Sequence, residues 1–184
     1  MRSKVEVARW GRLLAVRVTG YGTWREAQAL DAWAKDAAGP ETADLVVELT
    51  AARQLDSTFV GTLVGLARFL ASEHRGEVAL YGVSPAVEAN LRELGLHVVI
   101  TNIHAEPWPQ VVQWEELPTP EPPPDALLRH VLGAHEQLMA IDEGNVERFE
   151  ESVRMLRASL TPASAEQMDG NNKSSGRDPS HTSG

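Results

Sequence analysis

Between residues 42 and 101 the chain alternates short apolar runs with segments whose apolar residues recur every three or four positions. A short apolar run predicts a buried strand, whereas a repeat of three to four predicts a helix with one buried face. Alternating strands and helices are typical of an α/β architecture, in which helices pack on a sheet. The predicted order is strand 45–49, helix 57–70, strand 76–82, helix 84–94 and strand 97–101.

The residues before this alternation predict a strand hairpin and a further helix. Valine and leucine alternate with polar side chains in 4–10 and 12–20, and Gly11 lies between them at a spacing suited to a turn. An antiparallel hairpin joined to the later strands makes the predicted sheet a mixed one. The helix that follows has one buried stripe, formed by Ala27, Leu30, Ala34 and Ala37.

The triplet Asp56-Ser57-Thr58 lies where a strand and a loop give way to the helix 57–70. Asp56 is the predicted N-cap, and Ser57 then occupies the first helical turn, pointing outwards at the sheet edge. Capping alone explains these residue types, and that structural interpretation stays open. The apolar face of the helix is formed by Phe59, Leu63, Leu66 and Leu70.

The start of this helix is suited to an added anion. A helix N-terminus carries about half a positive charge, so a phosphate on Ser57 would be accommodated without unfolding the helix. It would change the local charge by about −1.5 to −2. Gly61 and Gly65 leave one side of the helix flat, so another backbone could approach it closely.

Five of the seven residues from 118 to 124 are proline, which predicts an extended spacer. Two helical segments follow it, separated by Asp142-Glu143-Gly144, and they predict an αα-hairpin. Gly144 is predicted to end the first helix and Asn145 to cap the second. The predicted units are a domain at 1–116, a linker at 117–124, a helical hairpin at 125–160 and a disordered tail at 161–184.

The second helix of the hairpin has an apolar seam with two interpretations. It either packs within the chain, on its partner helix or on the sheet, or it forms a helix-in-groove or homodimer surface. The proline spacer would allow the hairpin to move independently. The seam consists of Val146, Phe149, Val153, Leu156 and Leu160.

Composition excludes several classes of protein. The net charge is −9, which argues against binding to nucleic acid or to an anionic membrane surface. The chain has no cysteine, so disulfides and thiolate metal sites are excluded. No apolar stretch reaches the roughly 20 residues of a membrane-spanning helix, and residues 1–10 lack a signal-peptide pattern. These features predict a cytoplasmic protein.

Several motifs, which follow one another in the order seen in the STAS domain, resemble that domain. It is the fold of bacterial anti-sigma factor antagonists and of the cytoplasmic domains of sulfate transporters. The resemblance covers about residues 5 to 105. Each motif alone is weakly specific, but the ordered set is specific. The matching parts are the strand 45–49, the triplet 56–58, the glycine-containing helix 61–70, the strand 78–81, Val83-Ser84-Pro85 and Leu94-Gly95-Leu96.

The resemblance implies that Ser57 is the phosphoacceptor of a serine kinase that is also an anti-sigma factor. It also implies that the helix opened by Ser57 contributes the partner surface. One departure is that Gly20-Tyr21-Gly22-Thr23-Trp24 stands where antagonists carry a loop aspartate, beside Ser57. This departure argues against an anti-sigma kinase of the usual type as the partner. The predicted partner surface is Asp56, Thr58, Gly61, Thr62, Gly65 and Thr23.

Other chemistries fit the sequence less well. Leu55 and Phe59 occupy the glycine positions of the hydrolase signature G-x-S-x-G, and no histidine is assigned as a base for Ser57. His130 and His135 are five apart, so they are expected on different sides of their helix and predict no metal site. The glycines at 20 and 22 lack the third glycine of a dinucleotide motif and predict a turn. We therefore expect no enzymatic activity, metal or cofactor.

The sequence predicts a phosphorylation-switched protein-binding module similar to anti-sigma factor antagonists. Unmodified Ser57 would present the surface, and phosphate would repel the partner. The alternative is a constitutive STAS scaffold that binds its partners through the C-terminal hairpin, with Ser57 only part of a helix start.

Overall fold

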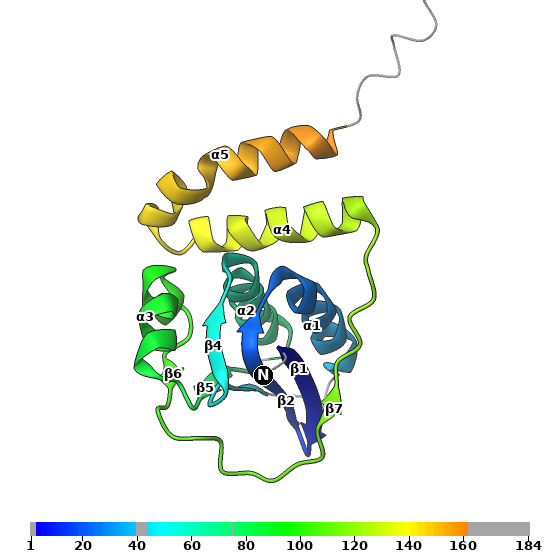
Figure 1. Ribbon diagram of the computed structural model, residues 1–184, viewed down its shortest axis with the longest axis vertical. Coiled ribbons are helices and arrows are strands. Elements are labelled where there is room, and N and C mark those ends of the chain that lie inside the picture. Colours follow the sequence, from blue (N-terminus) through cyan, green and yellow to red (C-terminus); the bar gives the residue numbers. More distant parts are fainter. Residues whose placement is uncertain (1–2, 40–43, 75, 162–184) are drawn as a thin grey trace, which may run out of the picture.

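A computed structural model describes residues 3–39, 44–74 and 76–161. Helices pack on one mixed sheet, and two C-terminal helices lie across them (Figure 1). The predicted α/β architecture is therefore confirmed. The strands are β1 (Lys4–Trp10), β2 (Leu13–Gly22), β3 (Asp44–Glu48), β4 (Ala52–Leu55), β5 (Val78–Tyr81), β6 (Asn102–Ile103) and β7 (Glu115–Glu116). The helices are α1 (Trp24–Ala37), α2 (Ser57–Phe69), α3 (Pro85–Glu93), α4 (Pro124–Met139) and α5 (Glu143–Leu160).

The strand order of the sheet is β6-β5-β3-β2-β1-β7. β1 and β2 form the predicted antiparallel hairpin, and Gly11 adopts the left-handed conformation at its turn (φ 59°). β2, β3, β5 and β6 pair in parallel, so the chain crosses over through helices between them. These crossovers place α1, α2 and α3 on the sheet.

β4 is a strand where the sequence predicts a loop. β3 pairs with the first half of β2, and β4 then pairs in parallel with Gly20–Gly22, beyond the end of β3. The same pairing extends β2 through the glycines that were predicted to form a turn. Because Gly22 lies opposite Leu55, both strands end together, and α2 begins at that edge.

Alternate residues of the strands pack on opposite faces of the sheet. On one face, α1, α2 and α3 cover side chains such as Leu14 and Val47, which are fully buried. On the other face, Ala15 and Val46 lie under Trp108, which belongs to the irregular segment leading to β7. The predicted stripe of α1 is buried as expected: Ala27, Leu30, Ala34 and Ala37.

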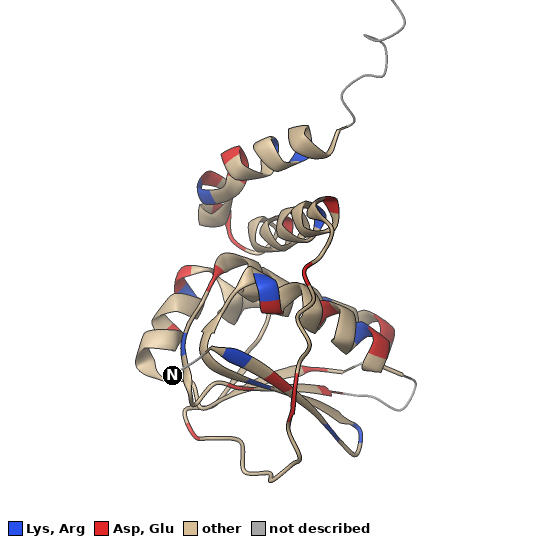
Figure 2. Cartoon of the chain, turned by 45° about the vertical axis from the view of Figure 1, so that its right-hand side comes forward, with Lys and Arg blue, Asp and Glu red and all other residues tan. Residues whose placement is uncertain are grey.

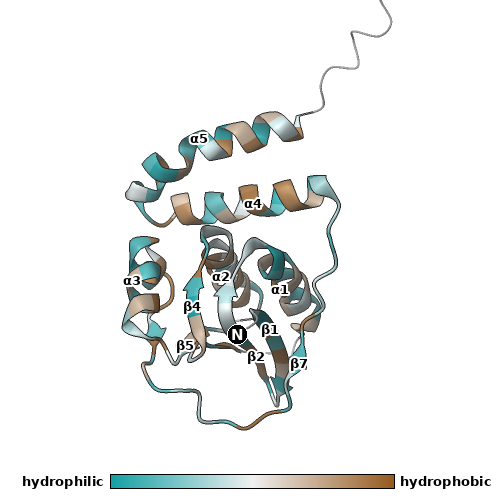
Figure 3. Ribbon diagram, in the orientation of Figure 1, coloured by the Kyte–Doolittle hydropathy of each residue, from teal (hydrophilic) through white to brown (hydrophobic). Residues whose placement is uncertain are grey.

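α4 and α5 form the predicted hairpin, and α4 lies between α2 and α5 (Figure 1). Leu138 of α4 and Phe149 and Val153 of α5 join the main hydrophobic core. Figure 3 shows hydrophobic and hydrophilic bands alternating along α4, whereas α5 is largely hydrophilic. The buried part of the apolar seam, Phe149 and Val153, therefore packs within the chain, as the first of its two interpretations expects.

The boundaries inside the hairpin differ from the prediction. Asp142, not Asn145, caps α5, and its side chain accepts a hydrogen bond from Gly144 N. Gly144 lies within α5 and does not adopt the left-handed conformation. Asn145 is buried instead, and its amide donates to the carbonyl oxygens of Leu94 and Leu138. The helix start therefore shifts by about one turn.

The predicted seam of α5 is only partly buried. Phe149 and Val153 are buried, but Val146 is 38% exposed because buried Asn145 takes the inward position. Leu156 and Leu160 are partly buried. The part of α5 beyond Val153 therefore packs less tightly than the three-to-four spacing predicts.

The segment 97–101, predicted as a strand, begins instead as a helical turn. Gly95 adopts the left-handed conformation (φ 74°), and a 3-10 turn follows at Leu96–Val98. Leu96 and Ile100 are buried while Val98 is 56% exposed, which is the spacing of one helical turn rather than of a strand. The last parallel strand, β6, starts only at Asn102.

The tip of the hairpin rests on the end of α3. A side-chain carbon added at Gly95 would lie 2.9 Å from Asp142 Cβ, and Arg148 forms an ion pair with Glu93 at 3.0 Å. The division into units at 1–116, 117–124 and 125–160 stays a prediction, and residues 162–184 of the predicted tail lie outside the described residues. Among the helices that the structure describes, none is long and apolar enough to span a bilayer.

Candidate functional site

The candidate site is centred on the start of α2, where Asp56 fixes two helices at once. Its carboxylate accepts a hydrogen bond from Phe59 N at 2.8 Å, which confirms the predicted N-cap. Its second oxygen accepts one from Trp24 N, also at 2.8 Å, at the start of α1. Asp56 N in turn donates to Gly22 O. The loop before α1 therefore lies beside Ser57, as the sequence predicts.

Ser57 is partly buried, and its hydroxyl contacts a histidine of α4. Ser57 Oγ lies 3.0 Å from His135 Nε2, across 78 residues of sequence. The imidazole of His135 stacks on Phe149 of α5 with ring centroids 4.5 Å apart. Ser57 is thus neither sealed in the core nor freely exposed, because the C-terminal hairpin covers it.

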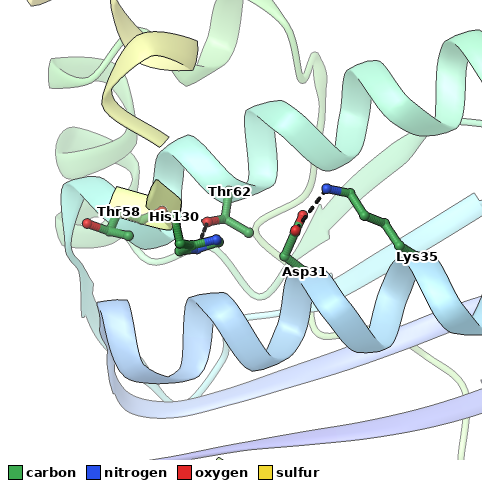
Figure 4. A network of polar contacts seen from close by, with 5 residues as sticks. All are labelled: Asp31, Lys35, Thr58, Thr62 and His130. Atoms are coloured by element: carbon green, nitrogen blue, oxygen red, sulfur yellow. Dashed lines mark hydrogen bonds and ion pairs between the residues drawn. The ribbon is translucent and has the colours of Figure 1, made fainter. Parts of the chain in front are cut away.

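A second contact of the same kind lies one turn further along α2. Thr62 Oγ1 donates its single proton to Thr58 O at 2.8 Å and lies 3.0 Å from His130 Nε2. Since that proton is already used, His130 Nε2 must carry a hydrogen and donate to Thr62. Figure 4 shows His130 reaching Thr62, with Asp31 and Lys35 of α1 alongside. We call this pair, Ser57–His135 and Thr62–His130, the histidine contacts.

Between the histidine contacts the two backbones touch. A side-chain carbon added at Gly61 would lie within 2.5 Å of Ala134 O and 3.0 Å from Ala134 Cα. At Gly65 the nearest atom to such a carbon would be Gln137 Cγ, at 3.7 Å. Only glycine at 61 therefore allows α4 to lie at this distance. We call the side of α2 formed by Ser57, Gly61, Thr62 and Gly65 the docking face.

The surroundings of both imidazoles favour their neutral form. Burial lowers the pKa of His130, and Lys35 acts in the same direction, while Asp31 and Asp56 oppose it. Burial likewise lowers the pKa of His135 against the opposing charge of Asp56. Docking of α4 therefore favours the uncharged form of both histidines.

The structure places the predicted phosphoacceptor and the predicted partner surface in two groups. Ser57, Gly61, Thr62 and Gly65 face α4, and Thr58 is buried at 5% exposure, with its carbonyl accepting from Thr62. Asp56 and Thr23 are the N-caps of α2 and α1, and Thr23 donates from its N and its Oγ1 to the Glu26 carboxylate. Their roles in binding a partner stay predictions.

Sequence reasoning did not place His130 and His135 at this site. Both contact α2, although their spacing of five was expected to direct them to different sides of the helix. Residues five apart differ by about 140° on a helix. Because α4 crosses α2 at Ala134, the long side chains of His130 and His135 reach α2 on either side of that crossing. Small residues at 61, 65, 133 and 134 were the signal available for this close approach.

The Ser57–His135 contact resembles a nucleophile and base but lacks a third group. In a serine hydrolase a carboxylate orients the histidine through Nδ1. Here His135 Nδ1 is buried and has no hydrogen-bond partner among the described residues. In the part of the chain that the structure describes, no three metal-binding side chains are grouped either. The arrangement therefore suits helix docking better than acyl transfer.

Many charged residues lie on the exposed sides of the helices, although Asp31 and Lys35 lie beside the docking face. Figure 2 marks acidic and basic residues on α1, α3, α4 and α5. Several of them pair with each other on the surface, as in Arg92–Glu88 of α3 and Arg154–Glu151 of α5. The contact between α2 and α4 joins small residues, hydroxyls and imidazoles, together with a hydrogen bond that Arg68 of α2 donates to Gln137 of α4.

The family model described as "Mlab, STAS domain" matches residues 5–101, which is more than half of the 184 residues. The chain belongs to the STAS domain family. This confirms the resemblance drawn from the ordered motifs. The matched part of this STAS protein ends before the irregular segment over the sheet and before the hairpin, so the family model does not cover α4 and α5.

Among solved structures, the anti-sigma factor antagonist SpoIIAA in its unphosphorylated form is similar to this STAS protein, with a TM-score of 0.40 and 16% sequence identity. The similarity covers 59% of this chain and 89% of that one. A search of curated protein sequences finds no match. Family membership therefore rests on the family model.

Proposed function

We propose that this STAS protein is a non-enzymatic signalling regulator that binds another protein through the docking face, in the manner of an anti-sigma factor antagonist. One observation carries the proposal: the start of α2 presents a hydroxyl, a capping carboxylate and a flat glycine surface outside the sheet, and a helix is seated there. A surface that accommodates one helix closely is suited to another.

We propose that Ser57 is the phosphoacceptor. Ser57 Oγ would form a bond to the γ-phosphorus of ATP held by a serine kinase. The bond to ADP would break with ADP taking the electron pair, and a base of the kinase would take the hydroxyl proton. The N-terminus of α2 favours the added negative charge, so the modified helix would persist. The phosphate would nevertheless repel a partner by charge and bulk.

The scaffold alternative has less support. Three apolar side chains of the hairpin pack in the core of the same chain: Leu138, Phe149 and Val153. The exposed residues of α5 are mainly charged. A scaffold would have to bind through that charged outer face. Replacing Arg154 and Glu151 together with alanine would then abolish partner binding, whereas the docking-face proposal expects no effect.

The direct test uses the full chain and the anti-sigma-type serine kinases encoded in its source genome. Each kinase is incubated with the chain and ATP, and phosphate is located by mass spectrometry of peptides. We expect one phosphoryl group on Ser57, and none on a Ser57→Ala variant.

Binding to the same kinase is then compared between two folded variants. Ser57→Ala should bind, and Ser57→Asp should bind at least tenfold more weakly because it places an anion in the interface. Equal binding by both variants, or no modification by any kinase, would contradict the phosphoswitch.

A further inference from the structure

A helix of the same chain, α4, occupies the docking face. α4 contacts Ser57, Gly61, Thr62 and Gly65, which are four of the residues assigned above to the phosphoacceptor and partner surface. The backbone contact at Gly61 leaves no room for a second helix beside α4. A partner that binds there must therefore first remove α4.

The contact is specific but contains groups that favour separation. His135 Nδ1 is buried without a hydrogen-bond partner among the described residues, which disfavours the docked state. A crevice of about 190 Å³ remains between α1, α2 and α4, lined by Asp31, Lys35 and Thr62 among others. A solvent-open crevice beside the contact and an unpaired polar atom within it are features of a contact that can open.

The connection to the core would keep a released hairpin attached. The segment from β7 to α4 runs along the side of α1 (Figure 1) and contains the prolines at 118–124. Such a segment is extended and does not depend on the hairpin for its conformation. Meanwhile the buried side chains of the sheet and of α1–α3 pack on one another. Opening would therefore be a local event.

While α4 is docked, the hairpin covers the Ser57 hydroxyl and hinders a kinase from reaching it. Its Oγ is at hydrogen-bond distance from His135, whose ring stacks on Phe149. A phosphoryl group on this oxygen needs the space that the imidazole occupies, so modification requires the hairpin to move. A phosphate would also lie next to the Asp56 carboxylate and would oppose redocking.

We propose that α4 is an internal substitute for a partner helix, and that the protein is autoinhibited until the hairpin leaves the docking face. The partner contact would be an α-helix with a small residue over Gly61 and polar side chains over Ser57 and Thr62. This rests on the docking face being the partner surface. The intramolecular part can be tested without a partner.

The first experiment measures local opening by hydrogen exchange in the full chain. Amides of α4 and α5 should exchange through an opening that leaves β2, β3 and β5 protected. Gly61→Ala should speed exchange in the hairpin at least tenfold, because its added carbon meets the backbone of Ala134. Gly65→Ala is the matched control, since its added carbon has ordinary contact distance.

The second experiment uses a synthetic peptide of residues 124–161 as the probe for the docking face. Ala134→Gln, on the α4 side, should displace the hairpin of the full chain and leave α2 unchanged. This variant should bind the peptide at least about tenfold more tightly than the unaltered chain, whose face is occupied. Gly133→Ala is the control, because a side-chain carbon there meets nothing within 4 Å.

Adding Gly61→Ala to Ala134→Gln should abolish peptide binding, which locates the peptide on α2. The proposal is overturned if the hairpin exchanges only together with the core strands, or if Ala134→Gln binds the peptide no better than Gly133→Ala. A released hairpin with no kinase that modifies Ser57 would instead contradict the proposed function and leave the internal contact established.

Discussion

At the residue scale, Asp56 does more than a helix cap requires. Its two carboxylate oxygens accept from Phe59 N in α2 and from Trp24 N in α1, so one side chain holds two helix starts together beside Ser57. The sequence identifies the cap because Asp precedes an apolar helix. The second bond depends on β2 and β4 ending side by side, which no local pattern indicates.

Replacing Asp56 with alanine should lower the free energy of unfolding by about 2 kcal/mol, because it removes a cap and leaves Trp24 N without its acceptor. Urea unfolding of the full chain measures this. Asp56→Asn is the control: its single oxygen can still cap Phe59 N, so it should lose about half as much. Equal losses would show that the second bond contributes nothing.

At the element scale, the small residues of α2 determine how it packs as much as its apolar face does. Gly61 disfavours a helix by about 1 kcal/mol relative to alanine, yet only glycine lets α4 approach this closely. The histidine contacts then lie on either side of this crossing. Glycine at position 61 lowers the helix propensity of α2 but allows the close contact with α4. The tertiary contact, and not helix propensity, therefore explains the glycine.

Docking of α4 should weaken as the pH falls. Burial lowers the pKa of His130 and His135 below the ordinary value of 6.5, so the docked state holds them neutral while the open state binds protons. The docking free energy is then fully present above pH 6.5 and is lost as the pH falls towards the lowered values. Asp31 and Asp56 reduce the effect, and Lys35 adds to it at His130.

Hydrogen exchange of α4 amides between pH 5 and 7.5, corrected for intrinsic exchange rates, measures this loss. The control is the double variant His130→Gln/His135→Gln, whose amides reach Ser57 and Thr62 but do not titrate. Its local opening should be independent of pH. An unaltered chain with the same independence would show that the histidines do not control docking.

At the scale of the whole molecule, the two faces of the sheet are covered in different ways. Helices and the hairpin lie on one face, while Trp108 and the irregular segment around it cover Ala8, Ala15 and Val46 on the other. Trp108 also meets Trp10 and Trp114 edge to face, each with centroids 6.2 Å apart. The hairpin and this aromatic cluster are therefore separated by the sheet.

Trp108→Ala should lower the global free energy of unfolding by about 3 kcal/mol, since it empties a buried site. The local opening of the hairpin should stay unchanged, because the substitution lies on the opposite face. Urea unfolding and hydrogen exchange of α4 separate the two quantities. Val111→Ala, at a position 96% exposed in the same segment, should change neither. Faster opening of the hairpin in Trp108→Ala would contradict the independence of the faces.

Local patterns were sufficient for most elements and for the family. Apolar spacing predicted α1 and α2, the cap at Asp56, the strands β1, β2, β3 and β5, and the pair α4 and α5. The same patterns failed at Leu96–Val98 and at the start of α5, where Gly95 and Asn145 serve the contact between the hairpin and α3. Both residues contact a segment that is distant in the sequence, so local patterns do not predict their conformation.

Ser57 and its position at a helix start were determined by the sequence alone, because capping and helical period depend on residues a few positions apart. Only the tertiary structure decided what lies over Ser57. His135 is 78 residues away, and it reaches Ser57 because α4 crosses α2 where Gly61 meets Ala134. Contacts of that range depend on how whole elements pack, and no local spacing encodes them.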